Sequence, residues 1–191
     1  WTDNWVASVG SPVVSGMTMS GLTTNVGWSY TMGAGFIPQV NGQITALGGF
    51  FMGTDTVRLN NTSGTLLASA TVTSANAWAY TNITPVSVTA GSTYYVGVDL
   101  PGSGGAYYSS AAHPQTVNNV QIVNTTYTSP VGNLSSSSAH GTGYVYGMAD
   151  IKFVAGTGAA TITITSTDGS GSGISTTKYC VDTTNTCTPA T

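Results

Sequence analysis

Side chains able to do acid–base or nucleophilic chemistry are few in this sequence. Six aspartates, two lysines and one arginine carry all of its full charges, and there is no glutamate. Glycoside hydrolysis needs two carboxylates facing each other across the scissile bond. Asp55, Asp99 and Asp150 show no spacing that predicts such a pair, so we expect them to be solvated or to cap turns. Asp55 and Arg58 lie three residues apart on a predicted strand, hence on opposite faces, and we expect no ion pair between them.

The two histidines are poor candidates for catalysis. His113 precedes Pro114, and His140 lies in the serine-rich stretch 135–141. Neither has the strand-turn context that holds a triad serine. One alternative is an adventitious metal held by the two histidines. Another is calcium held by residues 168–173, but this stretch lacks the second and third carboxylates of calcium-binding loops, so we favour a flexible linker there. The sequence predicts no catalytic site, no metal site and no cofactor.

Aromatic residues are the one group whose spacing could form a binding surface. Tyr107, Tyr108 and Tyr127 occur in stretches rich in glycine or threonine, which favour exposed loops, where they could stack against sugar rings. Three pairs occupy alternate positions and so share a strand face: Trp28 with Tyr30, Trp78 with Tyr80, and Tyr144 with Tyr146. Each pair could also stack against sugar rings. The same spacing is what a sandwich core requires, and we favour the core for Trp28 and Trp78.

These residues must be positioned by strands, because period-two alternation dominates the chain and helical spacing is nowhere sustained. Short strands punctuated by glycine predict an all-β fold, a two-sheet antiparallel β-sandwich of jelly-roll type with a C-terminal tail that contains strands. We expect a sandwich over residues 1–155 and an extension over residues 156–191. The expected strands are 17–20, 26–32, 43–51, 56–59, 67–72, 78–81, 86–89, 93–98, 117–123, 143–148 and 151–154.

Charge is scarce, at 5% of residues against about a quarter in an ordinary soluble domain. A surface of neutral hydroxyls and amides repels identical copies little, so packing against other chains costs less. The three cations are scattered, which predicts no nucleic-acid partner, and no apolar run is long enough to predict a membrane span. The chain opens at Trp1 without a basic, apolar leader. We expect an exported protein, extracellular or at the cell surface, whose signal has been removed.

Two further features favour export. Cys180 and Cys187 are the only cysteines and flank turn-forming residues, which favours a local disulfide and an oxidising compartment. Five N-x-Ser/Thr triplets are candidate glycosylation sites. They begin at Asn60, Asn61, Asn82, Asn124 and Asn133.

The tail contains the cleanest alternation in the chain, at residues 159–166. Ile162 and Ile164 lie on one face of this predicted strand and threonines on the other. Residues 156–191 are too few to bury enough surface for independent stability. We therefore expect the tail to dock on its own sandwich, to add to the sheet of a neighbouring subunit, or to belong to a second domain.

Residues 26–155 resemble a jelly-roll domain of unknown function that recurs in bacterial and archaeal cell-surface proteins. The resemblance is carried, in order, by residues 27–31, 44–51, 57–72, 78–80 and 83–96. Residues 159–191 resemble the opening strands of a bacterial or archaeal immunoglobulin-like repeat, through residues 161–165, 168–174 and 179–189. These families have no assigned catalytic residues, so the resemblance implies no active site.

These observations predict a protein that is not an enzyme. We expect an extracellular structural subunit that assembles with further copies into a filament, tube or surface layer, with the strand of Ile162 and Ile164 added to a neighbouring sheet. The alternative is a carbohydrate-binding or adhesive module of a larger cell-surface protein, which would bind surface glycans through Tyr107, Tyr108 and Tyr127.

Overall fold

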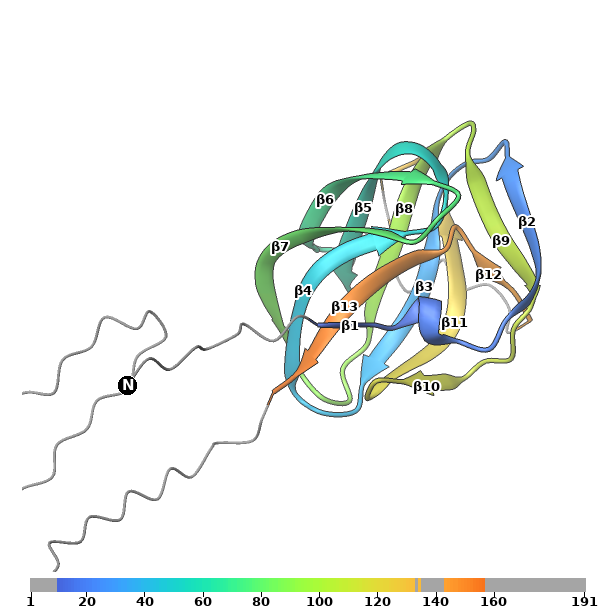
Figure 1. Cartoon of the computed structure of the whole chain (residues 1–191). Coiled ribbons are helices and arrows are strands. Elements are labelled where there is room, and N and C mark those ends of the chain that lie inside the picture. Colours follow the sequence, from blue (N-terminus) through green and yellow to red (C-terminus); the bar gives the residue numbers. More distant parts are fainter. Residues whose placement is uncertain (1–9, 133, 135–142, 157–191) are drawn as a thin grey trace, which may run out of the picture. The chain divides into compact units, whose positions relative to one another are not determined.

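The structure is a computed structural model of the whole chain, and it describes residues 10–132, 134 and 143–156 (Figure 1). The chain divides into two units, residues 1–157 and 158–191, and every described residue belongs to the first. Within the described ranges, no helix has the length and apolar character needed to cross a bilayer.

Strands make up nearly all of the regular structure in the described part. The elements are β1 (Ser11–Pro12), the 3₁₀ turn η1 (Val14–Gly16), β2 (Ser20–Val26), β3 (Ser29–Pro38), β4 (Gly42–Gly49), β5 (Met52–Asn61), β6 (Leu66–Ala75), β7 (Ala79–Val88), β8 (Tyr94–Pro101), β9 (Gly105–Ser110), β10 (Gln115–Val117), β11 (Val120–Thr128), β12 (Val145–Tyr146) and β13 (Ala149–Ala155).

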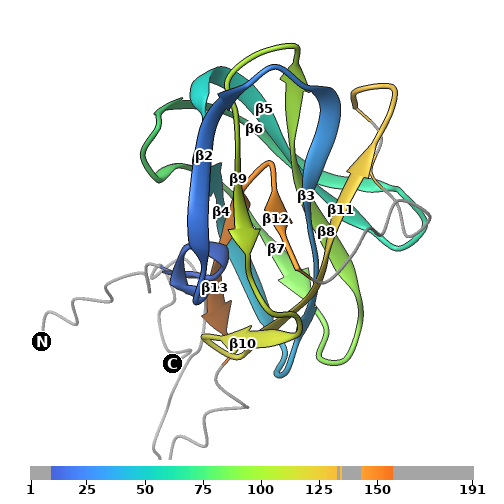
Figure 2. The ribbon, with the colours of Figure 1, turned by 90° about the vertical axis from the view of Figure 1, so that its right-hand side faces the viewer.

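The strands form three antiparallel sheets. A four-stranded sheet has the order β1-β13-β4-β7, a six-stranded sheet the order β10-β11-β3-β8-β5-β6, and a three-stranded sheet the order β12-β9-β2 (Figure 2). The chain crosses between the two larger sheets from β3 to β4, β4 to β5, β6 to β7 and β7 to β8. The set β1-β13-β4-β7 against β3-β8-β5-β6 is the strand order of a jelly roll, so the predicted fold class is confirmed.

The core lies between the sheets and is built by alternate residues of the central strands. On β5 and β8, Val57 lies opposite Val98 and Leu59 opposite Val96, and all four side chains are fully buried. Each such side chain contributes roughly 1.5–3 kcal/mol when it leaves water. The largest fully buried side chains include Phe36, Phe51, Ile44, Leu47, Leu100, Ile122, Met148 and Ile151.

Several predicted strand boundaries were wrong. The segments 78–81 and 86–89 belong to one strand, β7, which a register shift against β4 allows to pass Pro85. The segment 117–123 is split between β10 and β11 by a turn in which Asn118 and Asn119 have positive φ. β9 was missed, because its glycine-rich approach suggested a loop.

Candidate functional site

The outer strands of the sheets differ in how well their free edges are protected. β1, β10 and β12 are only two or three residues long. β2 is longer, but its ladder with β9 shifts register after Thr23. β7 carries Pro85, which has no N–H, and its ladder with β4 shifts register after Ile44. Very short strands, bulges and prolines are the usual devices that prevent unwanted pairing at a sheet edge.

β6 has fewer of these protections, because its one register shift with β5 lies at its first residues, between Leu66 and Ala68. It is ten residues long, contains no proline and no charge, and its ladder with β5 is regular from Ala68 to Ala75. The Thr81 hydroxyl donates a hydrogen bond of 2.9 Å to the carbonyl of Thr71, so the Thr71 backbone points away from β5. Because alternate residues of a strand point the same way, the backbone of Ser69 points outward too. Among the described strands, none pairs with this edge.

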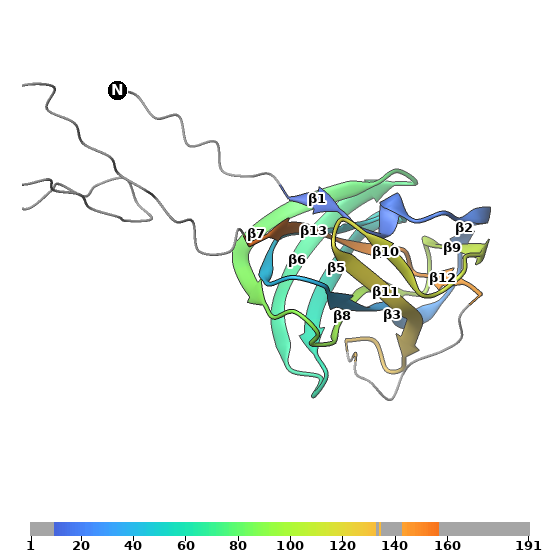
Figure 3. The same ribbon diagram turned by 90° about the horizontal axis from the view of Figure 1, so that it is seen from below.

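A groove of about 410 Å³ runs between β6 and β7, which lie side by side as outer strands of the two larger sheets (Figures 1 and 3). On the β6 side, Ala68 and Ala70 point toward the core but are too short to fill the gap between the sheets. Ile83 and Val86 form the half-buried apolar side on β7. None of the lining residues is charged, so the groove offers apolar surface beside free backbone groups.

A second cleft, of about 220 Å³, is lined by Trp28, Tyr30, Met32, Tyr127 and Tyr146. We call it the aromatic cleft. It lies where β3 and β11 of the six-stranded sheet meet β12 of the three-stranded sheet. The backbone N–H of Tyr146 donates to Thr125 Oγ1 at 3.1 Å, which holds β12 against β11.

The tyrosines predicted to be exposed in loops are on strands instead. Tyr107 and Tyr108 belong to β9 and Tyr127 to β11, and all three are half-buried. The structure brings Tyr107 within 5.4 Å of Trp28, and Tyr127 within 5.4 Å of Tyr30, between ring centroids. Glycine and threonine neighbours misled the prediction, because both residue types are also common next to strands in a sandwich.

Sequence reasoning favoured the core for Trp28, with sugar stacking by Trp28 and Tyr30 as the alternative. The structure shows Trp28 and Tyr30 half-buried, packed against the core on one side and lining the aromatic cleft on the other. Trp78 is also half-buried, but it packs against Phe50, with ring centroids 5.9 Å apart. The spacing of Trp28 and Tyr30 predicted that they share a face. It could not predict the cleft, because β12, which completes it, is distant in sequence.

Asp150 is completely buried, contrary to the expectation of a solvated or turn-capping carboxylate. Its Oδ1 accepts hydrogen bonds from the backbone N–H groups of Val13, Val14 and Ile151, and its Oδ2 from that of Ser15. The Tyr80 hydroxyl also donates to Oδ2, at 2.7 Å. Burial raises the pKa of Asp150, and the hydrogen bonds oppose that rise. This carboxylate fastens the N-terminal segment to the sheet and has no vacant position for a substrate.

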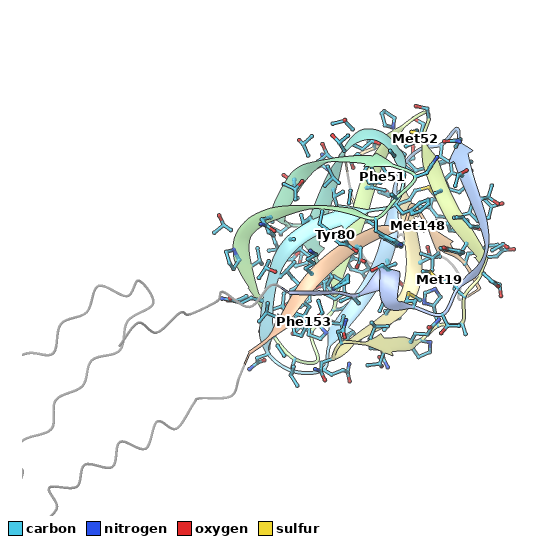
Figure 4. The ribbon with its side chains drawn as sticks, in the orientation of Figure 1. Met19, Phe51, Met52, Tyr80, Met148 and Phe153 are labelled. Atoms are coloured by element: carbon cyan, nitrogen blue, oxygen red, sulfur yellow. The ribbon has the colours of Figure 1, made fainter. Side chains whose placement is uncertain are left out.

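Tyr80 reaches Asp150 because of the residue between them. Gly48 on β4 is paired with Tyr80 on one side and with Asp150 on the other. A Cβ at Gly48 would clash with the Tyr80 ring, so only glycine lets the ring cross the strand. Figure 4 labels Tyr80 in the region of β4 and β13. Lys152 places its Nζ 4.7 Å from the centre of the same ring. Burial, and then the Asp150 carboxylate, raise the pKa of Tyr80, which keeps its hydroxyl protonated and donating.

Arg58 pairs with Asp99, not with Asp55. Arg58 Nε donates to Asp99 Oδ2 at 2.7 Å, and the Thr31 hydroxyl donates to Asp99 Oδ1 at 2.6 Å. The Thr31 oxygen in turn accepts from the backbone N–H of Gly132. Burial, and then the Asp99 charge, raise the pKa of Asp55. Asp99 is thus engaged in holding a loop on the outer face of the six-stranded sheet.

The remaining candidate residues are scattered. His113 Nε2 lies 2.9 Å from the carbonyl of Tyr144. Across the described residues, no group of three or more histidine, cysteine or acidic side chains is close enough to bind a metal. The predicted sites that lie outside the described residues are His140, Asn133, Ile162, Ile164, Cys180, Cys187 and residues 168–173.

The candidate glycosylation asparagines differ in accessibility. Asn60 is 3% exposed and its side-chain N–H donates to the Gly64 carbonyl, so a glycan there would have to displace that bond. Asn61 and Asn124 are half-buried, and their side-chain oxygens accept backbone hydrogen bonds. Asn82 is exposed and lines the groove beside β6.

Most of the described domain matches a known protein family in sequence. Residues 18–150, from just before β2 into β13, match the model of a domain of unknown function (DUF4082). The chain belongs to this family. The DUF4082 match covers both the groove and the aromatic cleft, and it agrees with the predicted resemblance to a jelly-roll domain of unknown function. No curated protein matches the chain.

Proposed function

We propose that this DUF4082 protein is a non-catalytic structural subunit that assembles outside the cell, with the free edge of β6 receiving a strand from a neighbouring copy. The observation that carries the proposal is the outer edge of β6, which no described strand pairs with, beside an open, uncharged groove. The proposed donor is the segment 161–165 of the neighbour, with Ile162 and Ile164 in the groove. Pairing of this kind joins backbone hydrogen bonds to side-chain pockets.

The spacing of the two partners supports this donor. Ala68 and Ala70 are two residues apart on the groove side of β6, and Ile162 and Ile164 are two residues apart in the donor. Since a strand advances about 3.4 Å per residue, both pairs repeat at about 6.8 Å. The side chains of Ile162 and Ile164, packed over the methyl groups of Ala68 and Ala70, would fill the gap between the sheets. A slip by one residue would turn threonines into the groove, so the pairing has a defined register.

Charge supports the proposal as well. The groove-lining residues are uncharged, and so are residues 157–167. Neither surface has to bury a charged group on docking. Removing a charge from water is the largest free-energy cost of burying a polar surface. A donor and an acceptor on different parts of one chain make a head-to-tail contact, which grows into a linear polymer unless the ring closes.

We further propose that the chain is exported and lies at the cell surface or in the extracellular space. A local Cys180–Cys187 disulfide fits an oxidising compartment, and the tail from residue 156 would act as an incomplete immunoglobulin-like unit or as the donor strand. Disulfide mapping of the purified protein tests this part: free thiols at both cysteines in material from its native surroundings would contradict it.

The decisive experiment compares two variants of one groove residue. Ser69→Pro copies onto β6 the protection that Pro85 gives β7: it removes an outward N–H that β5 does not use, so the domain's own ladder is kept. Ser69→Val is the matched control, because it keeps the N–H and suits a strand. We expect polymers of the wild type and S69V, and monomers of S69P, by negative-stain electron microscopy and light scattering.

The donor side is tested separately. The double variant Ile162→Asp/Ile164→Asp and deletion of residues 157–191 should both give folded monomers, with unchanged thermal unfolding of the sandwich. Polymers that persist after the deletion would overturn strand donation by the tail. Polymers that persist in S69P, while the deletion abolishes them, would overturn β6 as the acceptor.

A further inference from the structure

The aromatic cleft has a composition that the core does not require. A sandwich core is filled by side chains that interlock at close-packed density. Here Trp28, Tyr30, Tyr127 and Tyr146 are only half-buried and, together with the buried Met32, line an open cleft of about 220 Å³. Drug-sized ligands occupy pockets of about 300–1,000 Å³. The cleft therefore fits one small ring better than an extended ligand buried along its whole length.

The walls of the cleft are aromatic rings set nearly at right angles. Trp28 and Tyr146 meet at 84° with centroids 5.6 Å apart, and Tyr30 and Tyr127 meet at 78° with centroids 5.4 Å apart. Edge-to-face pairs leave the rings as walls of a corner rather than as one flat stack. A saturated ring with one apolar face and polar edges can lie against one wall and direct its hydroxyls toward the other.

The polar groups at the cleft are phenol hydroxyls. The rings of Tyr144 and Tyr107 lie next to Tyr146, with centroids 5.3 and 5.9 Å from its own. Burial, followed by the neighbouring Tyr144, Tyr107 and Tyr127, raises the pKa of Tyr146. A phenol hydroxyl is both a hydrogen-bond donor and an acceptor, as a sugar hydroxyl is. No charged residue lines the cleft, and an anionic ligand would find no cation there.

The cleft is held in shape by its frame. Gly147, directly after Tyr146, has a φ of +72°, and a Cβ at this position would lie 2.5 Å from Met32 Cβ. Only glycine allows β12 to turn this close to β3. The Gly147 N–H donates to the Ala106 carbonyl at 3.1 Å, which ties the turn to β9. A preformed frame lowers the ordering cost of binding a ligand.

We propose that the aromatic cleft binds one pyranose ring of a neutral glycan, with the sugar's C–H face against the aromatic walls and its hydroxyls at the phenol groups. This site is independent of strand addition, because Trp28 lies just before β3, the other lining residues lie on β3, β11 and β12, and the groove lies between β6 and β7. In an assembled polymer it would repeat once per subunit, so weak single sites would add up to avid binding.

Titration of the full chain with defined oligosaccharides tests the proposal. The neutral probes are cellohexaose, mannohexaose and N-acetylchitohexaose, the charged probe is hexagalacturonate, and the readouts are calorimetry and tryptophan fluorescence. We expect at least one neutral hexasaccharide to bind and hexagalacturonate not to bind. Binding should be the same in S69P, which separates this proposal from polymer formation. Failure of every neutral probe at millimolar concentration, or equal binding of the charged probe, would overturn it.

Two tryptophans of similar burial supply a matched pair of variants. Trp28→Ala removes a wall of the cleft and should weaken binding by at least about tenfold. Trp78→Ala, which removes a half-buried tryptophan elsewhere, should leave the affinity unchanged. Tyr127→Phe keeps the ring and removes one hydroxyl, and it serves if W28A does not fold; we expect a loss of about two- to tenfold. Unchanged affinity in both W28A and Y127F would overturn the proposal.

Discussion

Two sets of backbone groups in this domain lie outside the strand ladders, and they are treated differently. The N–H groups of Val13, Val14 and Ser15 are all bound by one buried carboxylate, that of Asp150. The outward backbone of β6 around Ser69 has no partner strand among the described residues. The first segment has its backbone N–H groups bound within the domain. The outer edge of β6 is suited to pairing with another chain, because no described strand pairs with it.

The largest expected effect comes from breaking the satisfied segment. Asp150→Ala leaves four backbone N–H groups and the Tyr80 hydroxyl without their acceptor in a buried site. We expect a loss of about 3–5 kcal/mol in the free energy of unfolding, measured by urea denaturation. Asp150→Asn, which keeps one acceptor oxygen, should fall between D150A and the wild type. A D150A domain as stable as the wild type would show that solvent replaces the carboxylate. The segment 13–15 would then not differ from the β6 edge in how its backbone groups are bound.

The next effect comes from closing the open edge. Ala70→Leu places a larger apolar side chain in the groove that the donor would fill, so we expect at least a tenfold higher concentration for polymer formation, about 1.4 kcal/mol per subunit. Thr71→Leu is the control, because the next residue points to the outer face. Light scattering across a concentration series measures both. Equal critical concentrations in A70L and T71L would contradict the assignment of the groove.

The sequence was informative where a local period decides the outcome. Alternation on β5 and β8 predicted the all-β sandwich, because buried pairs such as Val57 and Val98 follow from period two alone. It was uninformative where the outcome depends on which strands become neighbours. The contact between Tyr80 and Asp150 needs Gly48 between them, and the sequence separation of these residues gives no hint of that register. The open edge of β6 could likewise be read only from the strand order.

A smaller effect is expected when the satisfied segment loses one donor. Tyr80→Phe removes the hydroxyl that donates to Asp150 Oδ2 and lies 3.1 Å from Ser15 Oγ, while the backbone donors remain. Hydrogen bonds to charged groups contribute about 1.5–3 kcal/mol, and the retained ring limits the loss to about 1.5 kcal/mol. Urea denaturation measures it. A loss as large as that of D150A would mean that the tyrosine, not the backbone donors, sustains the buried carboxylate.

The smallest expected effect concerns the hydrogen bond that joins the β6 edge to β7, from the Thr81 hydroxyl to the Thr71 carbonyl. Thr81→Val removes it at an exposed position, so the free energy of unfolding should fall by less than about 0.5 kcal/mol. Thr54→Val is the matched control, because it removes an exposed hydroxyl contact of 2.9 Å to Thr73 on the face of the sheet rather than at its edge.

The two threonine variants should differ in assembly although they match in stability. T81V frees one more outward carbonyl of β6 for a donor strand, so polymers should nucleate at a lower concentration than in the wild type. T54V leaves the edge unchanged and should assemble like the wild type. If both variants assemble alike, the Thr71–Thr81 bond does not limit access to the edge, and the donor must pair with β6 only on the Leu66 side of Thr71, where residues 67–70 line the groove.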